Sequence, residues 1–75
     1  MEKKYFLAAI MVAGSNRAII RDYPNYSYTK YLAAFNMSIK IAENNEQVTN
    51  VIIFSNKGTV VNLTRKMLLL GESKT

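Results

Sequence analysis

The chain has 75 residues, which is enough for one small domain, and we expect residues 1–75 to form a single α+β unit. It contains no cysteine and no histidine, which excludes disulfide bonds and the commonest zinc, iron–sulfur and haem ligands. Ten basic residues against five acidic ones give a net charge of +5, which favours an acidic protein surface or a nucleic acid as partner.

The first two expected elements are strands. Tyr5–Ala13 is almost continuously apolar, which is typical of a central strand. A short secretory signal is the competing interpretation, but the run is short and Glu2 dilutes the basic residues before it. Three turn-forming residues at 14–16 then predict a hairpin to a second strand at Arg17–Tyr23. Pro24 has no N–H group, so we expect it to end that strand.

A helix is expected next, with Asn25 or Ser27 as its cap. Apolar side chains then recur at steps of three and four residues, which predicts one buried stripe: Tyr28, Tyr31, Leu32, Phe35, Ile39 and Ala42. The alternation of Met37, Ile39 and Ile41 would suit a strand, but it is shorter than the helical pattern. The stretch Asn44–Asn45 is the expected end of the helix.

The remaining residues predict a second hairpin. Val48–Ser55 is rich in β-branched and aromatic residues, Asn56–Gly58 is a turn, and Thr59–Met67 is the partner strand. The resulting order β-β-α-β-β predicts a two-layer α+β sandwich, in which one helix covers one face of a four-stranded antiparallel sheet. Its two free edges make a homodimer a further expectation.

Tyrosine and basic side chains are concentrated between residues 17 and 31. Tyrosine rings stack on unpaired bases and arginine and lysine neutralise phosphates, so the sheet face opposite the helix is the expected binding platform. Tyrosines packed over the helix, or a protein partner at the same patch, are the competing interpretations. A weaker basic group near the last hairpin also fits a charged edge strand. The candidate binding residues are Arg17, Arg21, Tyr23, Tyr26, Lys30, Lys57, Arg65 and Lys66.

Three consecutive leucines near the end of the chain form a second candidate surface. They are Leu68, Leu69 and Leu70, and all three cannot face inward from one element. They predict either a subunit or partner interface or the closure of the core.

The missing residue types argue against an enzyme. Without imidazole or thiol groups the usual nucleophile–base pairs are excluded, and the five acids are scattered along the sequence. We therefore expect no catalytic residues, no metal and no cofactor. A metal-free ribonuclease toxin, using Arg17 or Arg21 with a tyrosine and a lysine, is a minor alternative.

Binding without catalysis is therefore the leading expectation. Richness in asparagine, isoleucine, lysine and tyrosine resembles the small proteins of phages and mobile elements, many of which inhibit host factors. The sequence thus favours a cytoplasmic, non-enzymatic protein that occupies the surface of a host or defence protein. Binding of RNA or single-stranded DNA is the alternative. A membrane partner is not expected, because the first apolar run is far shorter than the roughly 20 residues that a spanning helix needs.

Overall fold

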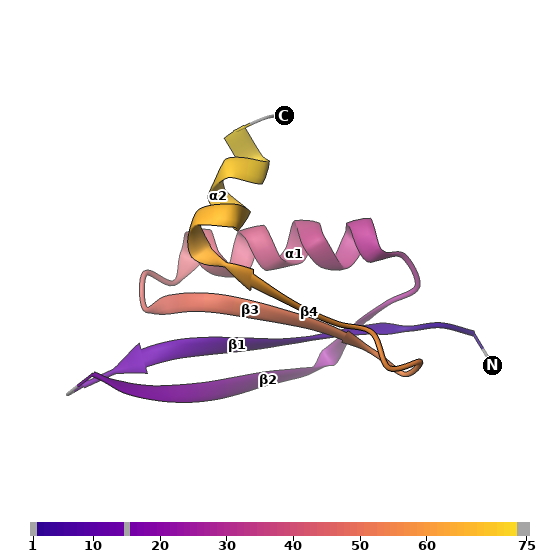
Figure 1. The fold of residues 1–75 in the computed structure, drawn as a ribbon, viewed down its shortest axis with the longest axis horizontal. Helices are drawn as coiled ribbons and strands as arrows, with labels where there is room; N and C mark the ends of the chain where they lie inside the picture. The colour runs from indigo at the N-terminus through magenta and orange to yellow at the C-terminus, as the bar shows by residue number, and fades with distance from the viewer. Residues whose placement is uncertain (1, 15, 74–75) are drawn as a thin grey trace.

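The computed structural model describes residues 2–14 and 16–73, which form an antiparallel sheet and two helices (Figure 1). The strands are β1 (Tyr5–Ala13), β2 (Arg17–Tyr28), β3 (Val48–Ser55) and β4 (Val60–Thr64). The helices are α1 (Tyr31–Asn44) and α2 (Arg65–Ser73). The predicted α+β class, with a four-stranded antiparallel sheet and a helix after β2, is confirmed. The second helix was not predicted.

The sheet has the order β2-β1-β3-β4, so β1 is hydrogen-bonded on both sides. One face of β1 supplies Leu7 and Ala9 to the core, and the alternate residues of the strand, which are also apolar, lie on the face without a helix. In the register, Leu7 of β1 lies between Tyr23 of β2 and Ile53 of β3. The turn between β3 and β4 has Gly58 at a φ of 92°, the left-handed conformation expected for it.

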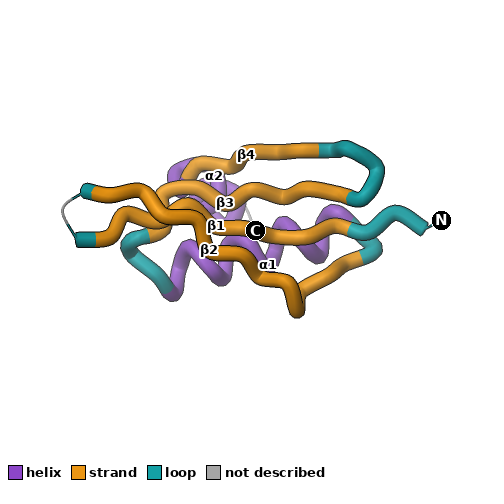
Figure 2. The backbone as a smooth tube through the Cα atoms, turned by 90° about the horizontal axis from the view of Figure 1, so that it is seen from below, coloured by secondary structure: helices purple, strands orange, loops and turns teal. Residues whose placement is uncertain are grey.

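Both helices lie on the same side of the sheet (Figures 1 and 2). The core forms between them and the sheet, and α1 fits closely because its buried face contains the small residues Ala34, Ser38 and Ala42. The buried Ser38 hydroxyl donates to the carbonyl oxygen of Ala34 at 2.9 Å, so it leaves no unsatisfied polar group. The core consists of Leu7, Ala9, Ala34, Ile39, Ile41, Ala42, Val48, Val51, Ile53, Leu63 and Leu68.

The predicted helical stripe was partly wrong. The helix begins at Tyr31, and the cap position is held by Lys30, whose side chain makes no capping hydrogen bond. Tyr28 therefore belongs to β2, and Leu32 is 66% exposed. The buried stripe instead follows the small residues Ala34, Ser38 and Ala42, which places Ile41 inward and Leu32 outward.

Pro24 does not end β2, contrary to the prediction. The register passes from Leu7 opposite Tyr23 to Phe6 opposite Ser27, so the three residues between Tyr23 and Ser27 bulge out of the ladder. Because β2 is an edge strand, the missing N–H of proline costs no ladder hydrogen bond at this bulge. The strand resumes and continues to Tyr28.

The predicted strand Thr59–Met67 was also too long. Thr64 ends β4, and its hydroxyl accepts a hydrogen bond from the backbone N–H of Met67 at 3.3 Å, as an N-cap does. Helix α2 then brings Leu68 into the core, whereas Leu70 is 52% exposed. The leucine triplet is therefore divided between the core and the surface.

Candidate binding surfaces

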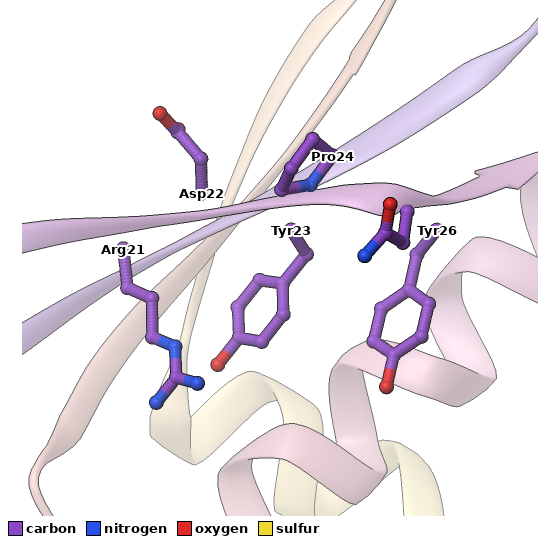
Figure 3. Close-up of a pocket in the computed structure, with 6 residues that line it drawn as sticks. Arg21, Asp22, Tyr23, Pro24 and Tyr26 are labelled. Atoms are coloured by element: carbon purple, nitrogen blue, oxygen red, sulfur yellow. The ribbon is translucent and has the colours of Figure 1, made fainter.

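The direction of the side chains of β2 decides where the predicted arginine–tyrosine patch lies. Arg21 is paired with Ala9 and Tyr23 with Leu7, and both of these β1 residues belong to the core beneath the helices. Residues directly opposite each other on paired strands share a face of the sheet. Arg21, Tyr23 and Tyr26 extend from one side of β2 toward the helices, and Asp22 and Pro24 lie on the other side (Figure 3). The expectation that this patch uses the helix-free face was therefore wrong.

The bulge in β2 brings two of the tyrosines together. Because it displaces three residues, Tyr26 returns to the same side of the strand as Tyr23. Their rings are stacked, with centroids 5.7 Å apart and planes inclined by 7°. The guanidinium carbon of Arg21 lies 5.4 Å from the centroid of the Tyr23 ring, two residues further along the strand. The result is a continuous row of one cation and two aromatic rings.

A groove of about 420 Å³ separates this row from α1. On the α1 side it is lined by Met37, Lys40, Ile41, Asn44 and Asn45. We call it the β2–α1 groove. Its base is apolar, because Ile41 is buried and Met37 half-buried. The groove has two cationic side chains and no carboxylate among its lining residues. Nearby, burial and, to a lesser extent, Tyr26 raise the pKa of the Tyr28 phenol.

The other predicted binding residues are not gathered into this groove. Arg17 lies at the start of β2, Lys30 immediately precedes α1, and Lys57 lies in the turn between β3 and β4. Lys66 is exposed on α2. The structure therefore joins Arg21, Tyr23 and Tyr26 and leaves the remaining cations at separate places on the surface.

Arg65 has a structural role, because its side chain is hydrogen-bonded to the backbone of other elements. Its Nη1 atom donates to the carbonyl oxygens of Ala42 at 2.8 Å, Asn45 at 3.1 Å and Val48 at 3.2 Å. The Asn45 side chain also donates to the carbonyl oxygen of Ile41 at 3.0 Å. The bonds to Ala42 and Ile41 satisfy carbonyl groups that the last turn of α1 leaves without partners within the helix. Arg65 thus ties the end of α1 and the start of β3 to α2.

The helix-free face of the sheet has a different chemical character, which was not predicted from the sequence. We call it the open face. Arg17 and Arg21, the two basic residues within the described strands, both lie on the helix side of β2, so no strand directs a lysine or arginine to the open face. Its apolar members, assigned from the strand register, are Phe6, Ala8, Ile10, Val12, Ala18, Ile20, Ile52, Phe54 and Val60.

The two phenylalanines of the open face lie in contact with each other toward the end of the sheet that carries the β3–β4 turn. Phe6 and Phe54 are directly paired on β1 and β3, and their ring centroids lie 5.7 Å apart. With Pro24 and Asp22 they line a hollow of about 380 Å³ at the bulge. Ile20 and Val60, on the two edge strands, are 69% and 68% exposed. The signal in the sequence was that apolar residues occupy both alternating sets of positions in β1 and β3, which is more than one buried face requires.

No model of a protein family, no curated protein and no solved structure matches this chain. Within residues 2–14 and 16–73, no cluster of three or more acidic, histidine or cysteine side chains is placed to hold a metal ion. In that same part of the chain, neither helix has the length and apolar character needed to cross a membrane.

Proposed function

We propose that this chain is a non-enzymatic binding protein that covers an apolar patch on a partner protein with its open face. The observation that carries the proposal is a sheet face that is apolar at its centre, receives no basic side chain from its strands and has no helix of the described chain over it. Exposed apolar patches of this kind mark sites of protein interaction.

The size of the open face fits a protein partner. With strands about 4.8 Å apart and about 3.3 Å per residue, the four strands, of which β1 has nine residues and β4 only five, cover about 500 Å². A stable protein–protein interface takes about 800 Å² from each partner, so this face supplies most of one side. The hollow beside Phe6 and Phe54 can receive one apolar anchor side chain, as interfaces with a dominant contact require.

The charge of the chain indicates what surrounds the partner's apolar patch. Lys4 donates its backbone N–H to the Asn56 side chain at 3.0 Å, which places it beside the turn that carries Lys57. Both lysines therefore lie at the phenylalanine end of the open face, where acidic side chains of a partner would pair with them. A second copy of the chain is a poorer partner, because it would bring a net charge of +5 to another +5. We propose that this acidic partner is a host or defence protein and that the chain inhibits it.

The test compares charge placed on the open face with charge placed elsewhere. Ile20→Lys and Val60→Lys each put an ammonium group on the face, and Leu32→Lys is the matched control, since Leu32 is 66% exposed on α1. Each protein is immobilised and used to capture proteins from a lysate of the cells that make it. We expect a protein retained by the wild type and by Leu32→Lys to be lost at least tenfold with the two open-face variants, corresponding to about 1.4 kcal/mol or more.

Two further measurements make the result decisive. Urea unfolding must show that the three variants fold, which their high exposure leads us to expect. Sedimentation of the pure protein should show a monomer. Equal capture by all variants, loss with Leu32→Lys alone, or a dimer that Ile20→Lys dissociates would each overturn the proposal.

A further inference from the structure

The β2–α1 groove has a chemistry that the open face lacks. From β2 it receives Arg21 and the phenol groups of Tyr23 and Tyr26, and from α1 it receives Lys40 and the amide of Asn44. All of these groups can donate hydrogen bonds, and two of them are cations. Since no carboxylate lines the groove, an anionic ligand would meet only complementary charge there.

Neither cation is already neutralised. Arg21 and Lys40 are exposed, and neither forms an ion pair with a described residue. Asp22, the acidic neighbour of Arg21 in the sequence, lies on the opposite side of β2 (Figure 3). Alternation along the strand thus separates this carboxylate from the groove, and the positive charge stays available for a ligand.

The stacked tyrosines indicate which class of anion fits. One face of Tyr23 is near Arg21 and the Tyr26 ring stacks next to it, and Tyr26 remains 40% exposed. A flat ring can therefore continue the stack on Tyr26 while a phosphate reaches the cations. Aromatic rings beside a basic groove are the usual means of holding unpaired nucleotides, because every base has a π face. A carboxylate on a peptide would use the cations but not the stack.

We propose that the β2–α1 groove binds single-stranded nucleic acid, with its phosphates at Arg21 and Lys40 and a base stacked on Tyr26. This inference is independent of the protein interface, because the groove and the open face lie on opposite sides of the sheet. It keeps the arginine–tyrosine patch that the sequence indicated but moves it to the helix side, with Lys40 of α1 as an added contact.

The test uses fluorescein-labelled decamers of uridine and of deoxythymidine, with anisotropy measured at 50 and 200 mM salt. We expect both oligonucleotides to bind at the lower salt concentration and to weaken steeply at the higher one. Arg21→Ala and Lys40→Ala should each weaken binding and lower the slope of log affinity against log salt by about 1. Tyr26→Leu should weaken it roughly 5- to 100-fold through loss of stacking, while Tyr26→Phe should retain most of the affinity.

Two controls distinguish binding in the β2–α1 groove from a general effect of net charge. Lys66→Ala removes one charge from exposed α2, outside the groove, and should bind the oligonucleotides almost as the wild type does. A labelled deca-glutamate peptide presents anions without bases and should bind much more weakly. The proposal is overturned by absent binding at 50 mM salt, by equal losses for Lys66→Ala and Arg21→Ala, or by deca-glutamate binding as tightly without any effect of Tyr26→Leu.

Discussion

Replacing Arg65 by alanine tests whether this residue holds the two helices and the sheet together. Its Nη1 atom lies within 3.2 Å of three carbonyl oxygens, from the last turn of α1, the residue that follows it and the first residue of β3. In Arg65→Ala these oxygens lose a charged donor in a half-buried position, and water can only partly replace it.

The size of the effect follows from the number of donors. Nη1 has two hydrogens for three acceptors, so we count two bonds, each contributing about 1.5–3 kcal/mol when the donor is charged. Partial access of water reduces the sum, and we expect Arg65→Ala to lower the free energy of unfolding by about 2–4 kcal/mol. This is a large fraction of the total free energy of unfolding, which for a small domain lies near the lower limit of about 5 kcal/mol.

Urea unfolding followed by circular dichroism measures this loss. With a slope of about 1 kcal/mol per molar urea, the midpoint should fall by roughly 2 M or more. Arg65→Lys keeps the charge but not the planar fork of donors, so it should fall between the wild type and alanine. Lys66→Ala is the control and should stay within about 0.5 kcal/mol of the wild type. If Arg65→Ala also stays within that limit, the structural role assigned to Arg65 is wrong.

Two further predictions concern the leucine triplet and the half-buried Tyr28. Leu68→Ala should lower the free energy of unfolding in urea by about 2–5 kcal/mol, because Leu68 is fully buried. Leu70→Ala should lower it by less than about 0.5 kcal/mol. Similar losses for the two variants would contradict the position of α2. The raised pKa of Tyr28 means that the folded protein keeps a proton that the unfolded chain loses above about pH 10, so stability should decline as the pH rises past that value. Tyr28→Phe, measured by urea unfolding between pH 8 and 10.5, should show a shallower decline, and an identical profile would show that burial does not perturb this phenol.

The elements that depend on local sequence were predicted well. The apolar run of β1, the turns at both hairpins and the β-branched residues of β3 each carry a signal within a few neighbouring residues. The chain was therefore placed in the correct fold class. The start of α2 also had a local signal, a threonine cap at Thr64, which the prediction of a strand through Met67 overlooked.

Local sequence could not predict on which face of the sheet the candidate binding residues lie. Alternation shows that Arg21 and Asp22 point in opposite directions, but it does not show which direction faces the helices. That choice is made by the pairing of β2 with β1 and by the bulge that returns Tyr26 to the side of Tyr23. Lys40 joins this patch only when α1 packs beside β2, and Arg65 finds its carbonyl partners only when α2 forms. These relations depend on contacts between distant parts of the sequence.

The two proposed surfaces are compatible with each other. An apolar face and a basic, aromatic groove on opposite sides of one sheet would allow the chain to hold a protein and a single strand at once. A partner that itself handles nucleic acid would present both ligands together. The nucleic-acid-binding groove of that partner would then compete with the β2–α1 groove for the nucleic acid, or be extended by it.

Methyl NMR of the full chain, free and bound to a protein purified by the capture experiment, tests the central assignment most directly. Isoleucine, valine and leucine methyl groups report from both sides of the sheet, with Ile10, Ile20, Ile52 and Val60 on the open face and Leu32 and Leu70 on the helices. The proposal requires large shift changes and added protection from a soluble spin label in the first group, with the two leucines unchanged. Changes confined to Leu32, Leu70 and the groove would show that the open face is not the protein-binding surface.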